Sequence, residues 1–585
     1  MTTKAASETK SGARRWVVRR DAEGAAPALA RALGVSEVVA GLLAARGVRG
    51  EESARTLLRP SLEQLHDPHL MLGMREAAAR VLRAVDAGER ILIYGDYDVD
   101  GTTGTVVLRR ALEVLGARTG YHVPHRFTEG YGIRQDVLER AKAEGYALVI
   151  SVDCGIRAHE PLEWARANGL DVIVTDHHLP DEGEGAPPAL AVLNPNQRGC
   201  AYPDKNLAGV GVAFKLAHAV LRERGRENLV PGFLKVVAIG TVADVAKLTG
   251  ENRAIVALGL RDLHRATNPG LRALMEVAGV GDGRGARAFD LGFRLGPRIN
   301  AAGRMDAARA VVELFETRDA AEARRLAEHL DARNRERRDV QQQVTERALA
   351  ELALGAPGET AVVVVAGEGW HRGVVGLAAS KICEKLGRPA VVISLEEDGT
   401  GHGSARSTDS FHMLDALTSC ADLLEAFGGH AHAAGLSVRR ENVAELRRRL
   451  NEHAARVLRE EDWVPCLEVD MELQAAALSL ELCAELEALE PFGAGWPRPV
   501  FATRGLRVVG EPRVVKERHL KFSAVAPDGR VHDCIWWGGA EKTTATPRPG
   551  QSIELAYAVE ANCWNGRTRL QLVVEDLKIS LESGD

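Results

Sequence analysis

Short apolar runs alternate with longer amphipathic segments through the first half of the chain. The runs are Ile91–Tyr94, Leu148–Val152, Val172–Thr175 and Val236–Thr241, and each has the length of a strand buried on both faces. Strands that alternate with helices predict a mostly parallel sheet covered by helices. We therefore expect an α/β domain over residues 76–318, preceded by an N-terminal extension over residues 1–75 with short helical patterns.

The pattern changes near residue 320. Residues 320–354 contain no Gly or Pro and consist of strong helix formers, which predicts one long helix within 319–355. Such a helix either packs on one domain or connects two, and its nearly continuous polar faces favour the connector. A second, smaller α/β domain is expected over residues 356–462, because this segment opens on the apolar run Ala361–Val365.

Many short strand-like runs separated by Gly, Pro and Asn fill residues 463–585. They are Leu506–Val509, Leu520–Val525, Cys534–Trp537, Ile553–Ala558 and Leu570–Val574. This spacing predicts an all-β barrel of the oligonucleotide-binding (OB) kind. Basic and ring-bearing residues are interleaved along it: Arg504, Arg507, Arg513, Lys516, Arg518, His519, Lys521, Trp536, Trp537, Trp564, Arg567 and Arg569. Such interleaving is typical of single-strand binding, but a tryptophan core with a solvated charged face gives the same pattern. Adjacent Trp536 and Trp537 should place one ring inside and one outside.

Composition limits the classes of protein. With 585 residues, 45% apolar and 27% charged, the chain is expected to form three or four globular domains. A net charge of −6 argues against a uniformly basic nucleic-acid binder but permits a local basic groove. Eight cysteines without a CxxC pair suggest neither a zinc cluster nor a disulfide framework. The scattered cysteines fit a reducing cytoplasm, and because no apolar stretch approaches about 18 residues we expect no membrane segment.

Acidic and imidazole side chains follow the four apolar runs of the first domain. Asp96, Asp98 and Asp100 follow the first run, Asp153 the second, Asp176-His177-His178 the third and Asp244 the fourth. The carboxyl ends of parallel strands meet at one edge of a sheet, so these side chains are expected to converge. Any one of these aspartates is more often a turn or cap residue, but four such positions together favour a metal site. Carboxylates with imidazole suit Mn²⁺ or Mg²⁺, which predicts a two-metal hydrolase.

The local backbone of the first acidic segment is also predicted. If residues 94–100 are extended, Asp96, Asp98 and Asp100 share one face, which is costly without neutralising cations. Gly101 then lets the chain turn, and Thr102 or Thr103 caps the following helix.

These motifs, taken in order, resemble the DHH phosphoesterase superfamily and, within it, the RecJ-type exonucleases. The similar segments are residues 95–101, 176–178, 206–216, 240–244 and 296–305, with residues 369–376, 403–407 and 427–435 resembling the DHHA1 domain. The resemblance implies a parallel-sheet DHH domain, a DHHA1 domain and a 5′→3′ exonuclease that releases 5′-mononucleotides from single-stranded DNA. It also implies two divalent ions, Mn²⁺ or Mg²⁺. DNA repair and recombination would be its setting.

The resemblance assigns roles to individual residues. Asp98, Asp100, Asp153, His177 and Asp244 fall on the metal positions, and Asp96 either binds metal or orients a ligand. His178 contacts the phosphate or donates a proton to the leaving oxygen, or else makes only a supporting hydrogen bond. The substrate-binding candidates are Arg109, Arg298, Asn300, Arg304, His371, Arg372, Ser404, Arg406, His430 and His432. Of these, Ser404 and Arg406 suit a terminal 5′-phosphate.

Two positions depart from the family pattern. Trp496-Pro497 replaces the usual Asn-Pro after Gly493-Ala494-Gly495, and Lys247 stands where proline is common. The first change leaves the docking of the barrel open. The alternatives are a phosphodiesterase for short or cyclic oligonucleotides and a non-catalytic Cdc45-like scaffold, although every acidic ligand position is occupied here. The expected protein partners are single-strand-binding protein and a RecQ-like helicase. The protein itself is expected to be a monomer.

Overall fold

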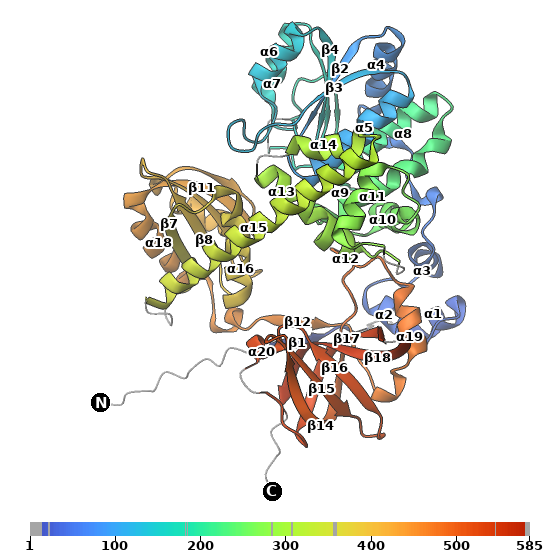
Figure 1. Ribbon diagram of the computed structural model, residues 1–585, viewed down its shortest axis with the longest axis vertical. Coiled ribbons are helices and arrows are strands. Elements are labelled where there is room, and N and C mark those ends of the chain that lie inside the picture. Colours follow the sequence, from blue (N-terminus) through green and yellow to red (C-terminus); the bar gives the residue numbers. More distant parts are fainter. Residues whose placement is uncertain are drawn as a thin grey trace.

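The computed structural model describes residues 14–20, 24–181, 183, 185–281, 285–305, 308–354, 360–543, 546–564 and 566–579. Figure 1 shows three domains, with the larger α/β domain above, the smaller one to the left and the barrel below. No helix within these residues is long and apolar enough to cross a bilayer.

The first domain is built on a five-stranded, entirely parallel sheet. Its strand order is β3-β2-β4-β5-β6, and its strands are β2 (Arg90–Gly95), β3 (Arg118–His122), β4 (Tyr146–Val152), β5 (Asp171–Thr175) and β6 (Ala191–Leu193). The parallel sheet is confirmed, and three of the four predicted runs are its central strands. The edge strand β3 was not predicted because its residues RTGYH include no continuous apolar run.

The fourth predicted strand, Val236–Thr241, is wrong. These residues lie in the helix α9 (Leu234–Ala243), and residues 237–241 are all buried. A helix buried on every side has no polar face, so its apolar run cannot be distinguished from that of a buried strand.

The other helices of this domain cover the sheet and extend beyond it. They are α4 (Met74–Asp86), α5 (Val99–Val114), α6 (Gln135–Ala143), α7 (His159–Ala167), α8 (Gly209–Glu223), α10 (Gly250–Leu263), α11 (Pro269–Ala278), α12 (Ala288–Asp290), α13 (Gly296–Arg304) and α14 (Ala308–Glu316). Helices α5 and α8 share one core with the sheet. A Cβ at Gly104 would lie 2.5 Å from Val152 Cγ1, so only glycine lets α5 approach β4 this closely.

Helix α15 (Ala320–Leu354) connects the two α/β domains. Leu326 and Leu330 belong to a core of the first domain, whereas Val344 and Ala348 belong to a core of the second. The connector prediction is therefore confirmed. The second domain has a five-stranded sheet of order β10-β11-β9-β8-β7. Its elements are β7 (Val363–Glu368), α16 (Arg372–Leu386), β8 (Ala390–Leu395), β9 (Thr400–Arg406), α17 (Met413–Thr418), β10 (Leu424–Gly429), β11 (Ala433–Arg439) and α18 (Val443–Val457).

The last domain is a closed barrel, as predicted. Its strands are β14 (Phe501–Val515), β15 (His519–Val525), β16 (Val531–Trp536), β18 (Arg567–Ile579) and β17 (Ser552–Trp564), and β17 pairs with β14 to close it. Strand β13 (Met471–Glu472) adds to β14, and the helices are α19 (Leu480–Glu487) and α20 (Gly539–Lys542). Trp536 is buried and Trp537 is exposed, which confirms the predicted split of these rings. The side chain of Trp564 lies outside the described part of the chain.

Residues 15–58 pack mainly against the barrel, and Leu57 O also accepts from Arg253 of the first domain over 3.1 Å. Strand β1 (Arg15–Val18) pairs in parallel with β12 (Cys466–Val469). The helices α1 (Ala26–Leu33), α2 (Glu37–Ala45) and α3 (Glu51–Leu58) share a hydrophobic core with the barrel strands. The beginning and the end of the described chain therefore form one packing unit. The domain boundaries stay predictions.

The barrel docks on the first domain through both positions that depart from the family pattern. A Cβ at Gly495 would lie 3.1 Å from Lys247 Cβ, and Leu248 N–H donates to Ala494 O over 2.7 Å. Trp496 is buried and its indole donates to Leu489 O over 3.1 Å. Arg253 donates to the carbonyls of residues 489–491 over 2.7–3.0 Å. The two departures thus meet at one interface.

Candidate active site

Helix α5 begins at Val99, inside the segment 94–100 that was predicted to be extended. Asp98 is the N-cap of α5, and its Oδ1 accepts from Asp100 N–H over 2.9 Å and Gly101 N–H over 3.1 Å. The prediction that Thr102 or Thr103 caps this helix is therefore wrong. The helix begins early because an aspartate directly before it satisfies its free N–H groups. A Cβ at Gly101 would lie 2.5 Å from Asp96 N, so this turn requires glycine.

Asp100 lies at the N-terminus of a second helix. Its two oxygens accept from Gly209 N–H over 2.6 Å and from Val210 N–H over 2.7 Å, at the start of α8. The carboxylate is fully buried. A helix N-terminus stabilises a negative charge through its free N–H groups, so α8 fixes this carboxylate in the ionisable cluster.

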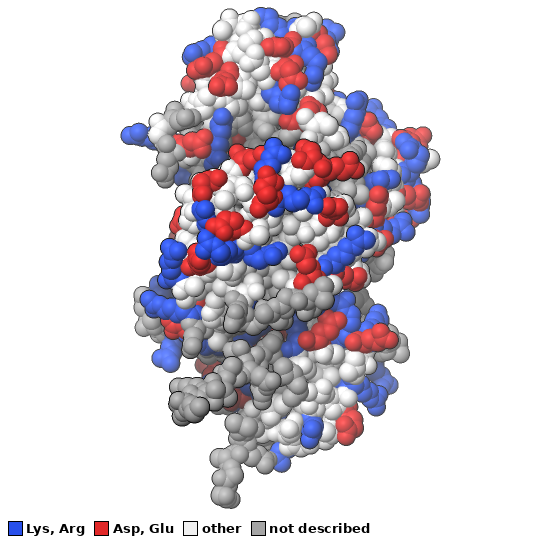
Figure 2. Space-filling model, turned by 90° about the vertical axis from the view of Figure 1, so that its left-hand side faces the viewer, with Lys and Arg blue, Asp and Glu red and all other residues white. Residues whose placement is uncertain are grey.

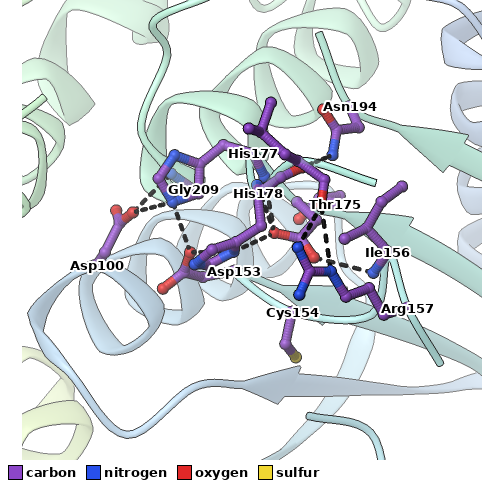
Figure 3. Close-up of polar contacts among 12 residues, drawn as sticks. Asp100, Asp153, Cys154, Ile156, Arg157, Thr175, His177, His178, Asn194 and Gly209 are labelled. Carbon is purple, nitrogen blue, oxygen red and sulfur yellow. Dashed lines mark hydrogen bonds and ion pairs between the residues drawn. The ribbon is translucent and has the colours of Figure 1, made fainter. Parts of the chain in front are cut away.

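Asp153 and His177 come from the ends of neighbouring strands, β4 and β5. Asp153 has a φ of 65°, a left-handed conformation that is uncommon for aspartate and costs roughly 1–3 kcal/mol. His177 Nε2 lies 3.3 Å from Asp153 Oδ1, 3.8 Å from Asp100 Oδ2 and 3.9 Å from Asp244 Oδ2. Figure 3 shows the imidazoles beside the carboxylates of Asp100 and Asp153. The predicted convergence is therefore confirmed, although Asp244 arrives as the C-cap of a helix rather than from a strand.

Asp176 organises the histidine pair and had no assigned role. Its Oδ1 accepts from the backbone N–H groups of His177 and His178 over 2.8 and 3.1 Å and lies 2.7 Å from His178 Nδ1. Its Oδ2 accepts from Ile156 N–H over 2.9 Å (Figure 3). Asn194 donates to His178 O over 2.8 Å. Asp176 is thus occupied by protein donors: it holds the imidazole of His178 directly and the backbone of His177 through its N–H.

Tyr131 is a second contributor that sequence reasoning missed. Its hydroxyl lies 3.1 Å from His178 Nδ1 and 3.3 Å from Asp153 O, and its side chain is half exposed. It comes from a loop flanked by Gly130 and Gly132, and those glycines were the only local signal. Although burial opposes it, the hydrogen bond to Asp176 raises the pKa of His178. His178 is therefore held as a potential proton donor.

The carboxylates are poorly compensated by the protein itself. Burial and the charge of Asp98 raise the pKa of Asp100 to about 7, and burial with Asp100 raises that of Asp244 to about 9. Burial, followed by neighbouring carboxylates, also raises the pKa values of Asp96 and Asp153. Asp96 Oδ1 and Asp153 Oδ1 are buried without a hydrogen-bond donor among the described residues. Burial and His178 lower the pKa of His177 to about 4, which leaves its imidazole neutral.

This donor set fits divalent cations. Three groups of side chains have ligand atoms within 4.8 Å of one another: Asp153-His177-His178, Asp100-His177-Asp244 and Asp96-Asp98-Asp153. Carboxylate oxygens with neutral imidazole are the ligands that Mn²⁺ and Mg²⁺ accept, and cations offset the repulsion between buried carboxylates. Asp153 and His177 each belong to two of the groups, and of the two only the carboxylate of Asp153 has two oxygens, so Asp153 would be able to serve both members of a pair of ions.

Four arginines approach one another beside this cluster. Arg304 donates to Gly373 O over 3.0 Å, and burial together with Arg126, Arg337 and Arg406 lowers its pKa to about 10. The guanidinium of Arg126 lies 4.9 Å from the centre of the Tyr97 ring. Within the described residues, no ion pair joins any of the four to a carboxylate. Arg304 and Arg406 were predicted as substrate ligands, whereas Arg126 and Arg337 were not.

Ser404 and α16 complete the surroundings of the arginines. Arg406 Nη1 donates to Ser404 Oγ over 3.0 Å. A Cβ at Gly376, on α16, would lie 2.9 Å from Ser404 Oγ and 3.2 Å from Arg406 Nη2, so the first half of this helix approaches both side chains. The carbonyl of Gly373, in the first turn of α16, accepts the hydrogen bond from Arg304. These groups form a basic site between the two α/β domains.

Other substrate candidates have internal partners. Arg109 pairs with Glu316 over 2.8 Å and lies over the Tyr121 ring, and Arg298 pairs with Asp331 over 2.9 Å. These ion pairs do not support their assignment as substrate ligands.

The remaining candidates serve the backbone or lie at the surface. Asn300 Oδ1 accepts from Val99 N–H over 3.0 Å, and His371 caps α16 through Gly373 N–H over 3.0 Å. Arg372 pairs with Glu396 over 3.2 Å. His430 and His432 are exposed beside the hairpin β10–β11. Asn300 thus lies next to the carboxylate cluster, because Val99 stands between Asp98 and Asp100, and His371 lies beside the basic site through Gly373, whose carbonyl accepts from Arg304.

The exposed charges of the described residues in Figure 2 do not form a surface patch of one sign. On the face shown in Figure 2, basic and acidic side chains are interspersed, without a broad basic area among the described residues. In the barrel, Arg504 pairs with Glu472 and Arg518 with Glu541, at 2.8 and 3.1 Å. Trp537 is exposed, with its ring 4.8 Å from that of His519. On this face the exposed charges are mixed, whereas the other three arginines described above lie close enough to Arg304 to add to the lowering of its pKa by burial.

Comparison with known proteins places each domain. Family models match residues 90–241 as the DHH family, N-terminal domain, residues 358–456 as the DHHA1 domain and residues 469–576 as the RecJ OB domain. The chain is 39% identical to the single-stranded-DNA-specific exonuclease RecJ of Bacillus subtilis, over 97% of this chain and 71% of that protein. It is 39% identical to that of Salmonella typhimurium, over 92% of this chain and 95% of that protein.

Solved structures agree with this relationship. RecJ from Thermus thermophilus in complex with Mn²⁺ aligns with a TM-score of 0.82 at 33% identity, covering 96% of this chain and 79% of that one. The same protein in complex with Mg²⁺ aligns with a TM-score of 0.77 at 31% identity, covering 97% and 79%. These are the two ions that the carboxylate and imidazole donors favour. From the order of the three family models and the identity across nearly its whole length, the chain belongs to the RecJ family.

Proposed function

We propose that this chain is a metal-dependent exonuclease that degrades single-stranded DNA from its 5′ end and releases 5′-mononucleotides. One observation carries the proposal: a buried carboxylate cluster that requires cations lies beside an arginine cluster that has no acidic partner in the described part of the chain. The first suits the hydrolysis of a phosphodiester, and the second suits an additional phosphate next to it.

The basic site supports end recognition. Arg304, Arg406 and Ser404 offer guanidinium and hydroxyl donors, and α16 begins beside them. An anion at a helix N-terminus and between guanidinium groups gains charge-assisted hydrogen bonds, as a terminal phosphate requires. Arg126 and Arg337 add further positive charge. A strand whose 5′-phosphate binds here presents its next phosphodiester toward Asp98. The carboxylate of Asp98 acts on Arg304, since its charge raises the pKa of that guanidinium against the larger lowering by burial.

The ligand residues then have distinct roles. Asp98, Asp100, Asp153, His177 and Asp244 would hold a pair of divalent ions, with Asp96 as a further ligand or orienting group. Such ions lower the pKa of bound water and stabilise charge on the scissile phosphate. His178, held through Nδ1 by Asp176 and Tyr131, donates a proton to the leaving oxygen. Asp176 fixes the imidazole of His178 and the backbone of His177.

The wider setting follows from the family. We propose that the protein acts in the cytoplasm as a monomer, in DNA repair and recombination, with single-strand-binding protein and a RecQ-like helicase as partners. The barrel, with the exposed Trp537 and its basic residues, offers a second contact for the strand.

The test uses single-stranded DNA labelled separately at each end, Mn²⁺, and the Asp153→Ala variant. Release of mononucleotide from the 5′ label first, absent in the variant, is the expected result. Turnover of dinucleotides but not long strands would move the protein to the small-substrate phosphodiesterases. Binding of the strand without cleavage would instead support the non-catalytic scaffold.

End recognition has its own comparison. Strands with a 5′-phosphate or a 5′-hydroxyl are compared for wild type, Arg406→Ala and the control Arg110→Ala, whose guanidinium pairs with Glu113 on the surface of α5. Arg406→Ala should remove the preference for the 5′-phosphate, whereas the control should keep it. An unchanged preference in Arg406→Ala would refute the assignment of the basic site.

A further inference from the structure

Three ligands of the metal site depend on two short segments of the first domain. Residues 206–210 hold Asp100 through N–H groups at the start of α8. In the same segment, the backbone of Leu207 makes a hydrogen bond with the imidazole of His177. The third ligand, Asp244, ends α9 and belongs to the turn that follows it. The separation between segment 206–210 and this turn therefore sets the width of one group of ligands.

The turn that carries Asp244 is strained. Val245 has a φ of 61°, and its side chain is 71% exposed. A β-branched residue in the left-handed region costs roughly 1–3 kcal/mol and persists only where the surrounding structure holds it. The N–H groups of Val245 and Ala246 bond back to α9 over 3.1 and 3.2 Å. The other side of the turn, from Lys247 onward, needs a separate restraint.

Asn252 supplies this restraint and joins the two segments. It lies in the first turn of α10 and is fully buried. Its Nδ2 donates to Asn206 O over 2.5 Å and to Lys247 O over 3.1 Å. Asn206 opens the segment that holds two of the ligands, and Lys247 lies three residues after Asp244. One amide nitrogen thus uses both of its N–H groups to fix the distance between these segments.

The amide oxygen of Asn252 has no comparable use. Its Oδ1 is buried without a hydrogen-bond donor among the described residues. An unpaired buried polar atom costs about 1–3 kcal/mol, so packing alone does not favour an amide at this position. An amide is, however, uncharged and offers two donors from one nitrogen, which is what two facing carbonyls require.

The support of Asn252 is itself fixed to the first segment. Asp204 Oδ1 accepts from Asn206 N–H and its Oδ2 accepts from Glu251 N–H, both over 2.9 Å. The other carboxylates come from elsewhere, at the ends of β2 and β4, and form the β2–β4 group: Asp96, Asp98 and Asp153. Within the described residues, no side-chain hydrogen bond joins Asn252 to this group.

We propose that Asn252 is a positioning residue for one ion of the pair, the ion that Asp100, His177 and Asp244 would hold. The inference rests on the proposed exonuclease function and deepens it, because it separates the two ions by what supports them. Without the bridge, the turn after α9 shifts away from the start of α8. The affinity for this ion then falls, whereas the β2–β4 group keeps its own ion.

The experiment titrates the full chain with Mn²⁺ by calorimetry and measures the Tm without Mn²⁺. The wild type should bind two ions. Asn252→Leu has a similar volume and no donor, and it should weaken one ion by about 10- to 100-fold while the other stays near its wild-type affinity. Asn252→Ser keeps one hydroxyl donor without added bulk and should weaken the same ion by a smaller factor. The serine variant also gives the answer if the leucine variant does not fold.

Asn268→Ser is the matched control in the same domain. The amide of Asn268 donates to Phe315 O over 2.6 Å, and its Oδ1 accepts from Leu271 N–H at the start of α11. Serine preserves this helix cap and removes only the donor to the carbonyl. The Tm of the control should therefore fall while both Mn²⁺ affinities stay at the wild-type values.

Each other outcome has a defined meaning. Unchanged Mn²⁺ affinities in the Asn252 variants, or an equal loss at both ions in a folded protein, would overturn the positioning role. The same selective loss in Asn268→Ser would also overturn it. A wild type that binds fewer than two ions would refute the pair of ions. A wild type that binds two ions without degrading single strands would refute the exonuclease function and leave the role of Asn252 intact.

Discussion

Replacing Gly209 by alanine tests how the metal site is built. Gly209 is the first residue of α8, and its N–H donates to Asp100 Oδ2 over 2.6 Å. A Cβ there would lie 2.5 Å from Asp153 Oδ1 and 2.7 Å from Asp153 Cβ. The closer distance is about 0.9 Å less than the 3.4 Å at which ordinary contact begins. Either Asp153 or the start of α8 must move by about this amount, and each holds a ligand carboxylate.

The magnitude follows from the tolerance of metal sites. Ligand distances are kept within about 0.2 Å, so a shift several times larger should weaken Mn²⁺ binding by at least about 10- to 100-fold. A misplacement of about 1 Å costs roughly 100-fold in rate. Alanine itself favours helix over glycine by up to about 1 kcal/mol, so lost helix formation is not the cause.

The assay measures Mn²⁺ binding by calorimetry and strand degradation at saturating Mn²⁺. Gly211→Ala is the matched control in the same helix, because its Cβ would meet only the Leu207 side chain, at 3.3 Å from Cδ2. Gly209→Ala should lose Mn²⁺ affinity while Gly211→Ala stays near wild type. Equal Mn²⁺ affinity and rate in the two variants would refute the steric argument.

Three further substitutions test other features. Asp153→Asn should raise the Tm of the metal-free protein, because burial and the charge of Asp100 disfavour the ionised carboxylate of Asp153. It should also remove most of the stabilisation by Mn²⁺, which is about 2.7 kcal/mol for the wild type at a Mn²⁺ concentration 100-fold above Kd. Calorimetry with and without Mn²⁺ measures both effects, and an equal response of the two proteins to Mn²⁺ would contradict the prediction. Arg253→Met should leave the buried carbonyl of Pro491 without its donor, cost about 1–3 kcal/mol and speed limited proteolysis next to the barrel. An unchanged proteolysis rate would contradict the docking role. Lys215→Met should lower the free energy of unfolding in urea by about 3–5 kcal/mol, because it removes the ammonium group that lies 2.7 Å from the fully buried carboxylate of Glu251. The double variant Lys215→Met with Glu251→Leu should recover most of this loss. No recovery would show that the loss is one of packing.

The parts of the fold that follow from local patterns were predictable. The central strands, the long helix and the barrel each carry an apolar period or a run of helix formers. Helix α9 was not, because burial on all sides leaves no period to read. The association of α1–α3 with the barrel was not either, since it depends on packing between distant segments.

The same distinction applies to the site. Asp153 and His177 were predictable because parallel strands bring their carboxyl ends together. Arg126 and Arg337 were missed because a loop and the connecting helix supply them, and nothing local marks a residue that only tertiary packing brings to an anion site. The ion pairs of Arg109 with Glu316 and of Arg298 with Asp331 were not predictable, because these partners are distant in sequence, and the substrate-binding assignment of both arginines stays a prediction.

The pairing of β1 with β12 sets an order for assembly during synthesis. Arg15 and Cys466 are 451 residues apart, so the ribosome completes β1 long before its partner strand exists. At roughly 5–20 residues per second, the wait is about 20–90 s. Throughout it, the apolar faces of α1–α3 have no barrel to cover them. The two α/β domains are translated in between and fold first, so the ends of the chain close the molecule last.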